Sequence, residues 1–204
     1  MALTHPPGHH ATFKSSNRFC IFNFAAAAAI HALESDPSLK VSILDWDVHY
    51  GQGVADIIQK HDRARYVSIH QSPAFPYMGS KFGVQGECRN VMTIPIIPDT
   101  TWGCGYREKF ENEVLPFLRS DTWEPDLTLI CAGYDALDSD ELASVSLNAS
   151  DYGEMTTKLL AHLGSGKGSS VALGLEGGYQ LREIPNGGNL ADAVTETIRS
   201  LVRK

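Results

Sequence analysis

Two carboxylates and an imidazole alternate in the segment 45–49, whose sequence is DWDVH. Alternate side chains of an extended chain point to the same side, so Asp45, Asp47 and His49 are expected to face one way. Carboxylate and imidazole groups bind divalent metals, and a catalytic zinc takes three protein ligands and leaves one position open. Asp135, just beyond another predicted strand, is the best third donor. The alternative is that the three residues cap a helix or lie in a solvated loop.

A pair of histidines lies in the segment 6–11, whose sequence is PPGHHA. Hydrolysis of an amide needs a general base for the water and an acid for the departing amine, and the pKa of histidine suits both roles. Asp45 is free to pair with a histidine if Asp47 and His49 hold the metal, and a neighbouring carboxylate makes a histidine more basic. Alternatively, His9 and His10 are surface residues without a catalytic role.

A glycine pair and a tyrosine follow another predicted strand, in the segment 175–179, LEGGY. Two glycines allow a tight turn and a close approach of the backbone to a ligand. Tyr179 would then stand at the edge of the sheet, where its hydroxyl can polarise a carbonyl and stabilise an oxyanion. Ordinary loop packing of the aromatic ring is the alternative.

The elements that position these residues alternate along the chain. Short apolar runs predict buried strands at 40–45, 65–69, 91–96, 126–132 and 170–175, and helical patterns cover 22–35, 54–60, 106–118, 151–163 and 189–202. Ser150 is the expected N-cap of the fourth helix, with Glu154 further on. A crossover helix between each pair of strands predicts a three-layer α/β/α fold with a mainly parallel sheet. Chemistry in such sheets lies at the carboxyl ends of the strands.

Composition bounds the class of protein. The 204 residues include 24 acidic and 17 basic side chains, giving a net charge of −7, which argues against direct binding of nucleic acid. The four cysteines form no C-x-x-C pair, which favours reduced thiols in an intracellular compartment, cytoplasm or nucleus before an organelle. No secretory signal or membrane-spanning segment is recognised. One domain over 1–204 is expected.

These segments, together with Phe19-Cys20-Ile21-Phe22-Asn23 and Cys131-Ala132-Gly133-Tyr134-Asp135-Ala136, resemble the histone deacetylase superfamily in order and spacing. The form is closer to the class II and bacterial acetylpolyamine amidohydrolase branch than to class I. The resemblance implies the arginase/deacetylase-type fold. It also implies a zinc-dependent amidohydrolase that releases acetate and a free amine from acetyl-lysine of a histone or other protein, with a role in chromatin regulation, or from an acetylated polyamine.

The resemblance also assigns roles to individual residues. Zinc ligands are Asp47, His49 and Asp135; His10 is the general base and then acid; His9, paired with Asp45, tunes the electrostatics; Tyr179 hydrogen-bonds the acetyl carbonyl. Phe19 and Phe75 line an acyl-lysine tunnel, Leu142 lies at its rim and the backbone of Gly133 lies against the substrate. A structural potassium is implied at Asp45, Asp47, His49 and the hydroxyl of Ser68.

The sequence departs from the family pattern in several places. About a third of the usual domain, including its first strands, has no counterpart before the paired histidines. Tyr50 replaces a second histidine, Gln52 stands where Asp or Asn usually supports the general base, and His5 and Arg18 replace an arginine and a glycine. A non-catalytic remnant or interaction module therefore remains an alternative. An arginase-type site with two manganese ions is a further alternative, although the sequence offers ligands for only one metal ion.

Overall fold

The computed structural model describes residue 2 and residues 6–164, 170–183 and 188–202, so His5 lies outside the described residues. Its centre is a six-stranded sheet in the order β3-β4-β2-β1-β5-β6. The strands are β1 (Val41–Asp45), β2 (Ala64–Gln71), β3 (Gly83–Gln85), β4 (Val91–Ile96), β5 (Leu127–Ala132) and β6 (Ser170–Leu175). All pairs are parallel except β3 with β4.

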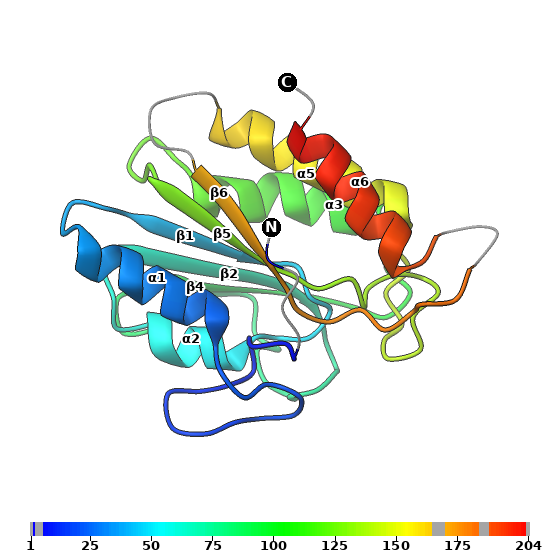
Figure 1. The fold of residues 1–204 in the computed structure, drawn as a ribbon, viewed down its shortest axis with the longest axis horizontal. Helices are drawn as coiled ribbons and strands as arrows, with labels where there is room; N and C mark the ends of the chain where they lie inside the picture. The colour runs from blue at the N-terminus through cyan, green and yellow to red at the C-terminus, as the bar shows by residue number, and fades with distance from the viewer. Residues whose placement is uncertain (1, 3–5, 165–169, 184–187, 203–204) are drawn as a thin grey trace.

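Helices cover both faces of the sheet (Figure 1). On one face lie α1 (Phe24–Ser35) and α2 (Gln52–Ile58). On the other lie α5 (Ala149–Leu163), α6 (Leu190–Val202) and a helical segment made of α3 (Tyr106–Lys109), the π-helix η1 (Phe110–Val114) and α4 (Leu115–Leu118). The predicted three-layer α/β/α fold with a mainly parallel sheet is confirmed.

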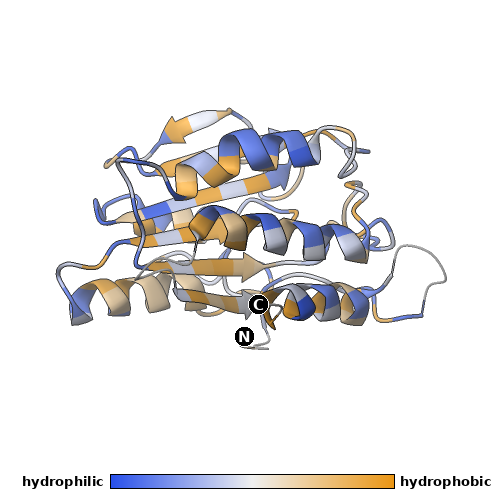
Figure 2. Ribbon diagram, turned by 90° about the horizontal axis from the view of Figure 1, so that it is seen from above, coloured by the Kyte–Doolittle hydropathy of each residue, from blue (hydrophilic) through white to orange (hydrophobic). Residues whose placement is uncertain are grey.

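The apolar runs of the central strands β1, β2, β4 and β5 form strands because these strands are buried between helices on the two faces of the sheet. Ile43 belongs to a core cluster beneath α1 and α2, whereas the next residue, Leu44, belongs to the cluster beneath α4 and α5. Successive side chains of a strand point to opposite faces, so both must be apolar here. Figure 2 shows the result as long hydrophobic stretches along the strands, while the helices carry hydrophilic segments.

Two local predictions were wrong, and a third was confirmed with a local irregularity. No helix joins β2 to β4 among the described residues; an irregular segment containing the short antiparallel β3 does so. The helical segment expected at 106–118 is confirmed, and it contains a π turn that precedes Pro116, a residue that cannot donate an amide hydrogen bond to the preceding turn. Asn148, rather than Ser150, caps α5, because its side chain and Asp151 form the capping box.

The order of the strands creates a switch point at the centre of the sheet. From β1 the chain passes through α2 to β2 on one side, whereas β5 pairs with the other side of β1 and continues to α5 on the opposite face. Ligands bind at such a switch point in open α/β sheets, beyond the carboxyl ends of the strands, so the segments that follow β1 and β5 are where a site is expected. Among the described residues, no helix combines the length and apolar character that crossing a bilayer requires.

Candidate active site

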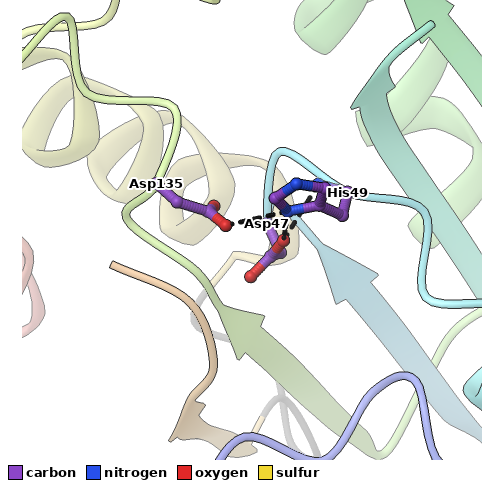
Figure 3. A group of neighbouring side chains, drawn as sticks. All are labelled: Asp47, His49 and Asp135. Carbon is purple, nitrogen blue, oxygen red and sulfur yellow. Dashed lines mark hydrogen bonds and ion pairs between the residues drawn. The ribbon is translucent and has the colours of Figure 1, made fainter. Parts of the chain in front are cut away.

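Asp47, His49 and Asp135 converge at this switch point, as Figure 3 shows. One ligand atom from each lies within 4.8 Å of the others, and all three residues are buried. His49 Nδ1 lies 3.3 Å from Asp47 Oδ1 and 3.0 Å from Asp135 Oδ2. Donors about 2.0–2.2 Å from a tetrahedral zinc stand about 3.3–3.6 Å apart, so small movements of these side chains would suit one such ion.

Hydrogen bonds from the backbone hold the two carboxylates in place. Asp135 Oδ1 accepts the amide of Val48 at 2.9 Å, which ties the segment after β5 to the segment after β1. Asp47 accepts the amide of His49 at 2.9 Å on Oδ1 and the amide of Gly177 at 2.8 Å on Oδ2. The ends of β1, β5 and β6 are therefore joined through the carboxylates that would bind a metal.

Two glycines give the carboxylates their space. A Cβ atom at Gly133 would overlap the carboxylate of Asp47, and one at Gly177 would overlap the carboxylates of both Asp47 and Asp135. The backbone of Gly133 was expected to lie against a substrate. The structure adds a second reason for glycine here, because any side chain at this position would displace Asp47.

The charges of the site favour a cation. Burial, together with the nearby Asp47, raises the pKa of Asp135 to about 6. Burial opposes the charging of His49, but hydrogen bonds to Asp135 and Asp47 outweigh it and raise the pKa of His49 to about 10. A divalent ion among these groups would neutralise the buried carboxylates, and His49 would then bind it in its neutral form. The donor set thus fits zinc.

Asp45 stands beside this group and supports His9. Its Oδ2 accepts hydrogen bonds from His9 Nδ1 at 3.1 Å and from the Tyr66 hydroxyl at 2.7 Å. His9 Nε2 lies 3.7 Å from Asp47 Oδ1. Burial opposes the charging of His9, but the carboxylates of Asp47 and Asp45 outweigh it, so the pKa of His9 lies well above the ordinary value.

His10 is held in a different state. Its Nδ1 donates to Gln52 Oε1 at 2.7 Å, and the Gln52 amide donates to the His10 carbonyl at 3.3 Å. Burial and the neighbouring His9 lower the pKa of His10 to about 3. The imidazole is therefore neutral near pH 7, with its Nε2 free to accept a proton. Gln52 thus occupies the supporting place expected of Asp or Asn, without adding a charge.

The backbone of the paired histidines is held by Glu176, to which the sequence analysis gave no role. Glu176 Oε2 accepts the amides of Gly8 at 2.6 Å and His9 at 3.0 Å. Burial raises the pKa of this carboxyl group to about 7. An acidic residue directly after a predicted strand and before a glycine pair was the available signal, because residues at that position lie at the carboxyl edge of the sheet.

Tyr179 lines the small cavity described below, together with the metal-binding group. Burial and the carboxylates of Asp47 and Asp135 raise the pKa of its hydroxyl, which therefore stays protonated and can donate a hydrogen bond. Its amide donates to Asp140 Oδ2 at 2.8 Å, and Asp140 Oδ1 accepts the amide of Leu142 at 3.0 Å. Asp140, which the sequence analysis missed, joins the tyrosine to the expected rim.

The remaining predicted residues occupy varied positions. The Phe75 ring lies 5.0 Å from that of His10, and the Phe19 ring 5.9 Å from that of Tyr179. Leu142 is exposed and does not line the cavity described below. The Ser68 hydroxyl, expected near a potassium ion, contacts His70 Nδ1 at 3.0 Å. The ring of Tyr50, one of the departures from the family pattern, packs against that of His70.

A small cavity opens above the metal-binding group. It is lined by residues from five segments of the chain: Pro7, His9, His10, Arg18, Phe19, Asp47, His49, Asp135, Gly177 and Tyr179. Its volume of about 10 Å³ accommodates about one water molecule. The cavity thus brings together the imidazoles, the tyrosine and the metal ligands, and Arg18 forms part of its lining.

Comparisons with known proteins agree with this arrangement. The histone deacetylase domain family matches residues 1–197. An uncharacterized protein of Synechocystis sp. is 43% identical over 200 residues, which cover 98% of this chain and 61% of the relative. Histone deacetylase 15 of Arabidopsis thaliana is 35% identical over 197 residues, covering 90% of this chain and 33% of that protein.

The fold is similar to a solved structure of the same family. The crystal structure of the HDA15 HD domain superposes with a TM-score of 0.83 at 30% identity, covering 98% of this chain and 56% of that one. The chain thus spans about three fifths or less of the proteins and the structure named here. Since the family match covers nearly the whole chain, the chain belongs to the histone deacetylase family.

Proposed function

We propose that this chain carries the catalytic centre of a zinc-dependent deacetylase that hydrolyses the acetyl amide of acetyl-lysine, in a histone or another protein, to acetate and a free amine. The observation that carries the proposal is the buried group of Asp47, His49 and Asp135, which faces His10 and Tyr179 across one small cavity. Membership of the family supports deacetylation, whereas the use of zinc and the substrate are part of the proposal.

Each residue has a role that its surroundings support. Zinc, when held by Asp47, His49 and Asp135, supplies a Lewis acid for the carbonyl and acidifies water. His10, neutral and fixed by Gln52 through Nδ1, takes the proton of the attacking water at Nε2 and passes it to the departing amine. The Tyr179 hydroxyl, protonated because its pKa is raised, donates to the carbonyl oxygen and then to the oxyanion.

His9 and Asp45 have an electrostatic rather than a proton-transferring role in this proposal. The pair is buried and hydrogen-bonded, and His9 stays charged because Asp47 and Asp45 raise its pKa. Together with burial, the charged His9 lowers the pKa of His10 and so keeps its imidazole neutral, with Nε2 unprotonated. The resemblance-based potassium at Asp45 and Ser68, and an intracellular location, remain predictions.

Phe19 and Phe75 are proposed to flank the neutral acetylated chain, since an apolar passage suits an uncharged alkyl group. An acetylated polyamine is the other substrate candidate, and it would use the same catalytic residues. The chain is proposed to be a partial deacetylase domain over 1–204, because it spans 61% of its Synechocystis relative. A non-catalytic interaction module is therefore the competing proposal.

Turnover of a fluorogenic acetyl-lysine substrate by zinc-loaded protein tests the proposal. We expect activity that a chelator abolishes and that Tyr179→Phe lowers about 10²–10³-fold, as loss of an oxyanion donor does elsewhere. Tyr77→Phe is the matched control, since the Tyr77 side chain is exposed and lies outside the cavity. A folded, zinc-loaded protein without turnover would support the non-catalytic alternative.

A further inference from the structure

Arg18 lines the cavity, and its exposed side chain contacts both of the phenylalanines proposed to flank the substrate. Its guanidinium carbon lies 4.5 Å from the centre of the Phe75 ring and 5.6 Å from that of Phe19. The metal ligands line the same cavity. A substrate chain entering between the rings must therefore pass this cation.

The backbone holds Arg18 in this place at a cost. Asn17 and Cys20 exchange both backbone hydrogen bonds, at 3.0 and 2.9 Å, so Arg18 and Phe19 form the tip of a tight turn. The φ angle of Arg18 is 49°, in the left-handed region that disfavours side chains other than glycine. An arginine kept where glycine fits better suggests a functional reason, because strained residues gather at ligand-binding positions.

The charge of Arg18 has no partner within the described part of the chain. The ion pairs and side-chain hydrogen bonds between described residues do not include it, and its side chain is exposed. Contacts with the two aromatic faces leave the N–H groups of the guanidinium free. A guanidinium in this state is suited to binding a carboxylate through two parallel hydrogen bonds.

We propose that Arg18 selects acetylated substrates that carry a carboxylate next to the acetyl-lysine chain. This inference rests on the proposed function. When the acyl chain enters between Phe19 and Phe75, the guanidinium moves to the rim and pairs with that carboxylate. Acetylated polyamines and acetyl-lysines flanked by basic residues are disfavoured, because they bring a like charge to the same place.

Matched peptides test the proposal on zinc-loaded protein. Three peptides place one acetyl-lysine between glutamates, between lysines or between neutral residues. A fourth peptide ends in acetyl-lysine with a free carboxylate, and a fifth has the same sequence with an amidated C-terminus. These arms distinguish a side-chain carboxylate from a terminal one. For wild type we expect kcat/KM to be about three- to tenfold higher for the acidic than for the basic peptide, mostly through KM, as exposed charge pairs allow.

Variants assign the preference to Arg18. Arg18→Gly, which suits the left-handed backbone, should reduce the ratio below about twofold, and Arg18→Glu should reverse it. Lys14→Glu makes the same charge change on an exposed side chain that does not line the cavity, and should keep the wild-type preference. Salt of about 1 M, which screens charges beyond about 3 Å, should weaken the preference.

Binding of the same peptides, measured by calorimetry on the zinc-loaded Tyr179→Phe variant, separates the two proposals. If the variant binds with the acidic preference while wild type turns over no peptide, the deacetylase proposal fails and the role of Arg18 stands. If wild type turns over acidic and basic peptides equally, or if Arg18→Gly keeps the preference, the role of Arg18 is overturned. If no peptide binds or reacts, both proposals are overturned.

Discussion

Replacing Glu176 by alanine removes the acceptor that fixes the paired histidines to the end of β6. In the native protein one carboxylate oxygen accepts the amides of Gly8 and His9 at 2.6 and 3.0 Å, and Glu176 is only 2% exposed. Alanine removes the acceptor of both buried amides.

The expected loss can be estimated from these two hydrogen bonds. A buried donor left unsatisfied costs about 1–3 kcal/mol, so two donors predict a loss of about 2–4 kcal/mol in the free energy of unfolding, allowing for some entry of water. Glutamine keeps an oxygen in the same place and is nearly isosteric with the neutral acid. Glu176→Gln should therefore cost less than about 1 kcal/mol at pH 5.

The pH dependence of the free energy of unfolding provides a second, independent estimate of the contribution of Glu176. Burial raises the pKa of Glu176 from 4.5 to about 7, so between these values the folded state binds more protons than the unfolded state. Stability from the neutral carboxyl group is therefore lost as pH rises through this window, by up to about 3 kcal/mol. Glutamine does not titrate, so Glu176→Gln should gain stability relative to wild type between pH 5 and pH 8.

Urea denaturation of the metal-free proteins at pH 5 and pH 8 measures both effects. Glu34→Ala is the matched control, because Glu34 is exposed on α1, and it should change stability by less than about 0.5 kcal/mol. If Glu176→Ala lost no more stability than this control, the hydrogen bonds from the amides of Gly8 and His9 to Glu176 would not contribute to stability. A constant difference between Glu176→Gln and wild type at the two pH values would contradict the burial argument.

Three further predictions concern the support of the site. Gln52→Asp should raise the pKa of His10 from about 3, because a carboxylate favours the imidazolium; NMR titration of the imidazole checks this, and an unchanged pKa would refute it. Gly177→Ala should weaken zinc binding at least about tenfold, because the added Cβ displaces the carboxylates. Gly174→Ala, with open space at its Cβ, should leave zinc binding unchanged. Competition with a zinc-binding dye compares the two variants, and equal zinc affinities would contradict the steric effect. Burial lowers the pKa of His70 to about 4, so the neutral ring adds stability above pH 6.5 that is lost as pH falls toward 4. The melting temperature of wild type should therefore exceed that of His70→Gln by less at pH 4 than at pH 6.5. A constant difference in thermal denaturation would contradict this.

Much of the fold could be predicted because its strands are buried on both faces. A strand such as β1, whose five residues are all buried, is mostly apolar, and Val41, Ile43 and Leu44 give a signal in the sequence that does not alternate. The edge strand β3 has only three residues, two of them exposed, and its position depends on pairing with β4. Such a strand leaves almost no local pattern, which explains why it was missed.

The metal-binding group was predictable for a related reason. Asp47 and His49 follow β1 and Asp135 follows β5, so the ends of two apolar runs indicated which residues would meet. The supporting contacts carried no such signal. Glu176 and Gly8 are 168 positions apart, and Asp140 and Tyr179 are 39 apart, so these pairs arise only from the tertiary packing of loops. The alternation argument was also incomplete, because Asp45 turns to His9 and Tyr66 instead of joining the metal-binding group.

Zinc titration by isothermal calorimetry, with metal content checked by mass spectrometry, tests the central claim most directly. Wild-type protein should bind one zinc ion per chain, and Asp135→Ala should lose it because one of three ligands is gone. Asp138→Ala, which changes an exposed carboxylate three residues further on, should bind as wild type does. Equal zinc binding by wild type and Asp135→Ala, or none by folded wild type, would contradict the account.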